Sequence, residues 1–226
     1  MSAKKSFFAF IVIVAIATAG IYVISRHLER DHGAQAVEPG ALPSWHAGNQ
    51  WVYRTSAGSN YTYTMSREEN LDGTPCYHLS GTISPPFEGW GGNTWRLYEN
   101  ATLDLRMIHV YDTDRAQTWR LTYSYSADPW PLSVGKTYTR SSTGTIDYMS
   151  GGDAYMDSLP PHTLTITVEN IESITVPAGT FSSFKIVARE GGTTVETRWY
   201  GDTVKNDVKR IDHQTGEVWE LSSYSV

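Results

Sequence analysis

The sequence has very little cysteine: Cys76 is the only one in 226 residues. A single cysteine excludes an internal disulfide and a zinc site built from cysteines. A lone cysteine is more often a small buried apolar residue than a nucleophile. Basic residues are also few and scattered, with 18 lysines and arginines against 24 acidic residues and a net charge of −6. Because phosphate binding requires clustered basic side chains, we predict no nucleic-acid partner.

The short motifs of common enzymes are absent as well. There is no Gly-x-Ser-x-Gly elbow, no His-Glu-x-x-His pair and no glycine-rich phosphate loop followed by lysine and a helix. Asp112-Thr113-Asp114 resembles part of a calcium loop but lacks its glycine and its terminal glutamate. We therefore predict no catalytic residue, no metal site, no cofactor and a protein that is not an enzyme. A hydrolase with an unrecognised site is the enzymatic alternative.

One long apolar run is present, from Phe7 to Ile24, preceded by Lys4 and Lys5. At about 1.5 Å per residue it is just long enough to cross a hydrocarbon core of roughly 30 Å as a helix. The nearest Ala-x-Ala, at 34–36, lies too far downstream for an ordinary cleavage site, so an uncleaved signal-anchor is favoured over a cleaved signal peptide.

This run divides the chain into four predicted parts. Residues 1–6 form a short cytoplasmic N-terminus, 7–25 a transmembrane signal-anchor helix, 26–42 a polar linker, and 43–226 an extracytoplasmic β-domain. The predicted location is the cytoplasmic membrane, with a single pass and the C-terminal domain on the extracytoplasmic side.

Beyond the linker, the chain alternates between apolar and polar residues with a period of two. Residues 118–125 (TWRLTYSY), 163–169 (TLTITVE) and 183–190 (SFKIVARE) each place apolar side chains on one face and polar ones on the other. This is the pattern of antiparallel strands with one wet face. Asp72-Gly73, Gly191-Gly192 and Thr215-Gly216 separate such runs as hairpin turns do. Residues 85–92 (PPFEGWGG) and 147–162 are interpreted as irregular, with room for a turn of helix near 150–160.

Several strings resemble those of poorly characterised secreted or membrane-anchored prokaryotic β-domains of unknown function. They are VPAGTFSSFKI (176–186), RWYGDTVKNDVKRID (198–212) and EVWEL (217–221), with GNQWVYR (48–54) as the matching N-terminal part. Such domains are similar to the lipoprotein-carrier fold of the LolA/LolB type. The resemblance implies a mainly β fold, a curved antiparallel sheet or incomplete β-barrel, whose hollow holds acyl chains in the carrier proteins. The VPAGTF string itself is interpreted as a corner between two strands.

Aromatic residues are the best candidates for a ligand site, because the chain has eight tryptophans and 14 tyrosines. Packing in the hydrophobic core explains many of these aromatic residues, but large apolar surfaces on an open sheet usually mark a binding site. The predicted ligand-binding residues are Phe87, Trp90, Trp95, Trp119, Tyr123 and Trp199.

We predict a non-enzymatic binding module that holds an apolar ligand or lipid in a concave sheet face. The alternative is a structural or accessory subunit of a membrane complex, with protein partners. Residues 7–25 supply the contact with the membrane in either case. Asn60 and Asn100 match the N-glycosylation pattern, which matters only in a host with that machinery.

Overall fold

The structure is a computed structural model that describes residues 40–84, 94–112, 117–125, 130–150 and 153–226. No helix in those ranges is both long and apolar enough to cross a membrane. The predicted N-terminus, signal-anchor helix and most of the linker lie outside the described residues, so these assignments stay predictions.

The described chain is built from strands, as the period-two pattern predicts. Twelve strands follow one another: β1 (Gln50–Thr55), β2 (Asn60–Leu71), β3 (Thr74–Ser84), β4 (Thr94–Glu99), β5 (Leu105–Asp112), β6 (Gln117–Tyr125), β7 (Thr137–Ser150), β8 (Asp153–Val176), β9 (Gly179–Glu190), β10 (Thr193–Gly201), β11 (Asn206–Asp212) and β12 (Val218–Ser225).

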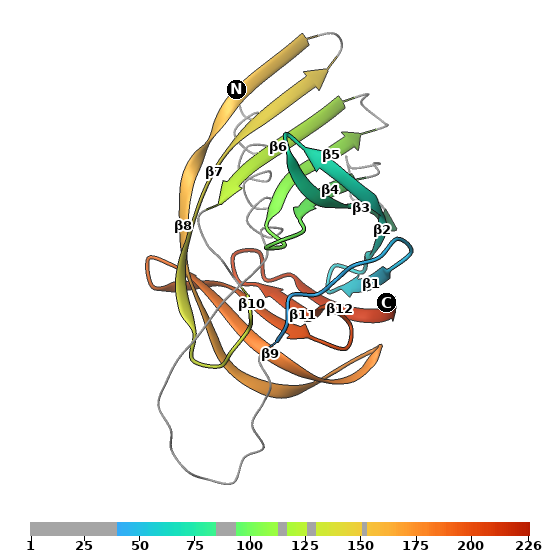
Figure 1. Cartoon of the computed structure of the whole chain (residues 1–226), viewed down its shortest axis with the longest axis vertical. Helices are drawn as coiled ribbons and strands as arrows, with labels where there is room; N and C mark the ends of the chain where they lie inside the picture. Colours follow the sequence, from blue (N-terminus) through green and yellow to red (C-terminus); the bar gives the residue numbers. More distant parts are fainter. Residues whose placement is uncertain (1–39, 85–93, 113–116, 126–129, 151–152) are drawn as a thin grey trace.

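Every strand pairs antiparallel with its neighbours in sequence, and β1 pairs with β12, so the sheet closes into a barrel (Figure 1). The prediction of a mainly β, antiparallel fold is confirmed, but the prediction of an incomplete barrel is wrong. The closing ladder runs from Gln50↔Ser225 to Thr55↔Trp219. Alternating residues identify a strand, but they do not say which two edges will satisfy each other's backbone groups.

The predicted turns form as expected. Asp72 and Gly73 join β2 to β3 with φ values of 50° and 90°, and Gly191 and Gly192 join β9 to β10 with 54° and 87°. Positive φ at both central positions is the requirement of a tight hairpin turn. Val176 pairs with Gly179, so VPAGTF is the corner between β8 and β9.

Residues 147–162, expected to be irregular, are instead the end of β7 and the start of β8, and no helical turn forms in their described part. The two prolines at 160 and 161 fall at a register shift, between the pairs Ser142↔His162 and Gly144↔Leu159. β8 pairs with β9 only from Thr165 onward. The prolines therefore lie where β8 has one strand partner, and an edge strand tolerates proline because a lost N–H donor matters less there.

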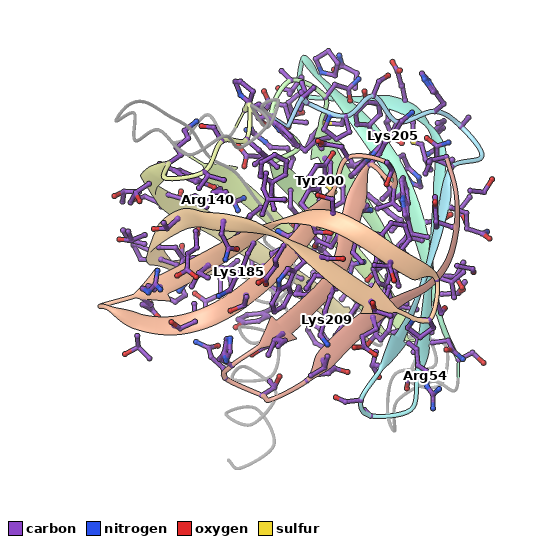
Figure 2. All side chains as sticks on the ribbon, turned by 90° about the horizontal axis from the view of Figure 1, so that it is seen from below. Arg54, Arg140, Lys185, Tyr200, Lys205 and Lys209 are labelled. Carbon is purple, nitrogen blue, oxygen red and sulfur yellow. The ribbon has the colours of Figure 1, made fainter. Side chains whose placement is uncertain are left out.

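One end of the barrel is filled by side chains from outside the strands. About eight strands make a barrel whose inward side chains just fill it, so twelve strands need further filling. Trp45, ahead of β1, donates from Nε1 to the Lys205 carbonyl (2.8 Å), and Trp130, ahead of β7, donates to the Thr102 carbonyl (3.0 Å). In the view of Figure 2, Tyr200 lies within the ring of strands, and its ring centroid is 5.5 Å from that of Trp130. We call this the plugged end.

The inner face of β5 to β8 carries an aliphatic cluster, which consists of Leu105, Ile108, Val110, Leu121, Ile146 and Leu159. The larger core, toward β1 and β9 to β12, is richer in aromatic side chains. The β7–β8 hairpin extends beyond the other strands (Figure 1). The inner face of the barrel is therefore aliphatic at β5 to β8 and richer in aromatic side chains toward β1 and β9 to β12.

Candidate functional site

Charged side chains lie inside the barrel, between the two apolar clusters. On β10, Glu196 pairs across from Ala188 and Arg198 from Ile186, and both of these β9 residues belong to the larger core. Side chains paired directly across neighbouring strands share a face. Glu196 and Arg198 therefore point inward. Arg210, which is paired with Arg198 on one side and with Trp219 on the other, points inward with them.

The same reasoning places Arg96 of β4 inside. It pairs with Leu79 of the larger core on one side and with Ile108 of the aliphatic cluster on the other. We call Arg96, Glu196, Arg198, Asp207 and Arg210 the inner charged cluster.

Two of its arginines have carboxylate partners. Arg198 donates from Nε to Asp207 Oδ2 at 2.8 Å, and its Nη2 donates to the same oxygen. Arg210 Nε lies 3.7 Å from Glu196 Oε2, which is an ion pair without a hydrogen bond. The Arg210 guanidinium carbon also lies 4.4 Å from the ring centroid of Trp219. Arg198 and Arg210 are thus compensated to different degrees.

Arg96 differs from both. It is 4% exposed, and no carboxylate among the described residues lies within ion-pair distance of it. Its guanidinium carbon lies 4.7 Å from the ring centroid of Tyr63. A cation held over an aromatic face gains about 2 kcal/mol when desolvated. The guanidinium also forms a side-chain hydrogen bond with Tyr63. Removing an ion from water costs several kcal/mol, so one neutral tyrosine compensates the charge only in part.

The three arginines converge on a group of tyrosines. Burial raises the pKa of the Tyr98 hydroxyl, and the positive charges of Arg96, Arg198 and Arg210 oppose that rise. Burial also raises the pKa of Tyr61, against Arg96 and Arg210. Tyr61 stacks on Trp219 with centroids 4.1 Å apart. Side chains from β2, β4, β10, β11 and β12 therefore meet in one region of the interior.

Burial also governs the two carboxyl groups of the inner charged cluster. It raises the pKa of Glu196 to about 7, although Arg198 and Arg210 lower it. The pKa of Asp207 is raised for the same reason, against Arg198. Buried carboxyl groups prefer the neutral form because the charged form loses its hydration. Glu196 therefore titrates near neutral pH.

Several polar atoms of this region have no hydrogen-bond partner among the described residues. The donors are Arg96 Nε, Arg210 Nε and Nη2, and Trp219 Nε1; the acceptors are Glu196 Oε2 and Asp207 Oδ1. Buried polar atoms are nearly always hydrogen-bonded, so such a concentration requires a reason. An anion placed among the arginines would accept from these donors. In the described ranges, no three His, Cys, Asp or Glu side chains lie close enough together to hold a metal ion.

Of the six predicted ligand-binding residues, the structure describes the side chains of Trp95 and Trp199, and neither faces the inner charged cluster. Trp95, next to the inward Arg96, lies on the outer face, where its ring stacks with His78 (5.3 Å) and His109 (4.7 Å). Trp199, next to the inward Arg198, also faces away from the inner charged cluster and donates to Glu172 Oε1. Phe87 and Trp90, and the side chains of Trp119 and Tyr123, lie outside the described part of the chain. A ligand function for these residues stays a prediction.

Sequence reasoning missed the inner charged cluster because charged residues of an alternating strand are normally assigned to the wet face. In VETRWY (195–200), alternation separates Glu196 and Arg198 from Val195 and Trp199. It does not say that the charged face is the inner one. The only available signal was that aromatic Tyr98 and Tyr200 share a face with Arg96 and Arg198, respectively.

The protein is therefore an antiparallel barrel of twelve strands in sequence order. Its one end is filled by side chains, and its interior has a charged, tyrosine-rich layer beside an aliphatic inner face. No protein-family model and no curated protein sequence matches the chain.

Two solved structures are similar over most of its length. One is a "putative lipoprotein" from Parabacteroides distasonis, with 13% identity, 84% of this chain and 100% of the other covered, and a TM-score of 0.38. The other is a "putative exported protein with YmcC-like fold" from Bacteroides fragilis, with 10% identity, 83% and 100% covered, and a TM-score of 0.40.

Proposed function

We propose that the chain is a membrane-anchored, extracytoplasmic, non-enzymatic module that binds an apolar or lipid ligand against the inner face of its barrel. The observation that carries this proposal is the aliphatic cluster on the inner face of β5 to β8, which adjoins the charged layer at Ile108↔Arg96. The six side chains of the cluster are 0–9% exposed, so a ligand tail that reaches them packs within the interior. An aliphatic region beside a charged one suits a molecule with a tail and a head. The apolar run at 7–24 supports anchoring in a membrane.

A break in strand pairing gives the ligand a route to this surface. The first part of β8, residues 153–164, pairs with β7 on one edge, and its other edge has no strand partner among the described residues. At about 3.3 Å per residue this edge is roughly 40 Å long. Leu159 of the aliphatic cluster lies on it. A ligand reaching the cluster here displaces no backbone ladder.

The test is native mass spectrometry of the full-length chain extracted from its own membrane in mild detergent. The wild type is expected to retain about one acyl lipid per chain. Leu159→Gln, which puts an amide into the aliphatic cluster, is expected to lose it. Ser158→Gln makes the same change at the neighbouring exposed position and is expected to retain it. Circular dichroism of each variant checks that the barrel is folded.

Lipid-free wild-type protein that also fails to bind a fluorescent acyl probe would overturn the proposal. The accessory-subunit function is the alternative, and the β7–β8 hairpin favours it, since Met149, Tyr155 and Met156 are 60%, 50% and 70% exposed there. Stoichiometric protein subunits in place of lipid, lost on changing Met149 and Met156 to serine, would support that alternative.

A further inference from the structure

We propose that Arg96, assisted by Arg210, binds the headgroup of the ligand, and that this headgroup is the carboxylate of a long-chain acid. This inference rests on the proposed function, because it places the head of the same ligand whose tail contacts the aliphatic cluster. It names a chemical class, a singly charged anion on an acyl chain.

The first argument is charge. Arg198 is paired with Asp207, Arg210 lies 3.7 Å from Glu196, and Arg140 near the plugged end lies 3.0 Å from Asp104. Asp212, also buried, accepts from the backbone N–H groups of Gln214 and Thr215. Of these inward arginines only Arg96 has no carboxylate partner, and arginine does not release its proton at physiological pH. A buried positive charge without a carboxylate partner calls for a negative charge.

The second argument is the number of donors. Four buried donor nitrogens have no partner among the described residues: Arg96 Nε, Arg210 Nε and Nη2, and Trp219 Nε1. A carboxylate offers two oxygens with about four acceptor sites, and guanidinium groups bind it in a planar, two-pronged arrangement. A continuous stack of rings links the two arginines. Arg96 lies over Tyr63, and Arg210 lies over Trp219. Tyr61 stacks on both of these rings, with centroids 6.3 and 4.1 Å away.

The third argument is continuity with the apolar surface. Arg96 lies between Leu79 and Ile108 in the strand register, where the larger core meets the aliphatic cluster. An acyl chain whose head lies at Arg96 therefore continues over Ile108 toward Leu121 and Ile146. The head and the tail of one molecule meet chemically matched surfaces without a change of direction.

The experiment is a competition between palmitate and hexadecanol, which share a sixteen-carbon chain and differ in the charge of the head. Full-length protein in detergent is offered both in equal amount, and the bound ratio is read by native mass spectrometry. The wild type is expected to prefer palmitate by about tenfold or more, the effect of a hydrogen bond to a charged group. Arg96→Met is expected to bring the ratio close to one and to leave hexadecanol binding unchanged. Arg96→Lys, which keeps the charge without the planar fork, is expected to retain part of the preference.

Arg67→Met is the matched control, because Arg67 lies on the surface and pairs with Glu69. It is expected to keep the wild-type ratio. Equal binding of the two ligands by the wild type overturns the headgroup proposal and leaves the proposed function standing. Binding of neither ligand overturns the proposed function itself. A wild-type preference for palmitate that survives in Arg96→Met assigns the carboxylate to another residue and overturns the inference.

Discussion

At the scale of single residues, the barrel interior is defined by how each buried charge is compensated. The Arg140–Asp104 pair is almost fully buried on both sides, whereas Arg96 has no carboxylate partner among the described residues and interacts with the ring and the side-chain oxygen of Tyr63. Taking a charge out of water costs several kcal/mol unless a partner compensates it. An apolar side chain of similar size at this position, as in Arg96→Met, is therefore expected not to lower the unfolding free energy of the ligand-free protein.

Glu196 makes the stability of the protein depend on pH. Burial raises its pKa in the folded state to about 7, above the 4.5 of an exposed glutamate. A raised pKa in an acid contributes stability below the unfolded pKa, and this contribution is lost as the pH rises through the folded pKa. Asp104, raised to about 6, acts in the same direction. We predict that Glu196→Gln flattens the decline in unfolding free energy between pH 4.5 and pH 8 by roughly 1–3 kcal/mol.

Urea unfolding of both proteins across that range measures the difference. Comparison with the wild type separates the effect of Glu196 from those of Asp104, His78 and His109. Burial lowers the pKa values of the two histidines, so their contribution to the unfolding free energy increases as the pH rises. Parallel pH profiles for the two proteins would show that Glu196 does not titrate in this range.

At the scale of elements, the alternation of residues identified strands at 118–125, 163–169 and 183–190 and the turns between strands, but not which face is inside or how far each strand runs. Leu164, Ile166 and Val168 are buried as the alternation of β8 predicts, because apolar side chains that share one face of a strand are stable only when that face packs against the core. The inward charges of β10 were missed because the barrel encloses polar groups that a single sheet would leave in water. The long start of β8 was missed because prolines count against a strand, and whether an edge is unpaired depends on where β9 ends.

β7 lies close to both neighbouring strands at Gly144. A Cβ added there would lie 2.3 Å from the Thr122 carbonyl oxygen and 3.0 Å from Leu159 Cδ1. We predict that Gly144→Ala lowers the unfolding free energy by about 1–3 kcal/mol, since backbone must move to admit the methyl group. Thr143→Ala, at the exposed neighbouring position, is expected to change it by about 0.5 kcal/mol or less. Denaturant midpoints give both values, and equal midpoints would contradict the close approach.

At the scale of the whole molecule, the plugged end depends on segments that belong to no strand. Trp45 contacts the rings of Trp51, Tyr77 and Tyr98 with centroids 5.3, 5.5 and 5.6 Å away, and it bonds to Lys205 across the barrel. These contacts tie the segment before β1 to the β10–β11 connection. The filled end and the aliphatic inner face therefore belong to one continuous interior.

We predict that Trp45→Ala destabilises the protein by about 3–5 kcal/mol, the usual cost of removing a buried indole. Trp45→Phe keeps most of the ring packing and loses the bond to Lys205, so it is expected to cost about 1–3 kcal/mol. Guanidinium unfolding followed by far-ultraviolet circular dichroism measures both. A loss below 1 kcal/mol for Trp45→Ala would mean that the plug is not part of the cooperative unit.

The ladder between β1 and β12 also constrains how the chain is made. During synthesis β1 leaves the ribosome first and β12 last. The backbone of Gln50 therefore cannot pair with that of Ser225 until the chain is nearly complete. Until then a growing sheet presents two unsatisfied edges, and such edges recruit other chains into aggregates. The contact also spans most of the chain, which slows folding because a large loop must close first. The outer edge of β1 therefore stays unpaired in a nascent chain until β12, the last strand, has emerged.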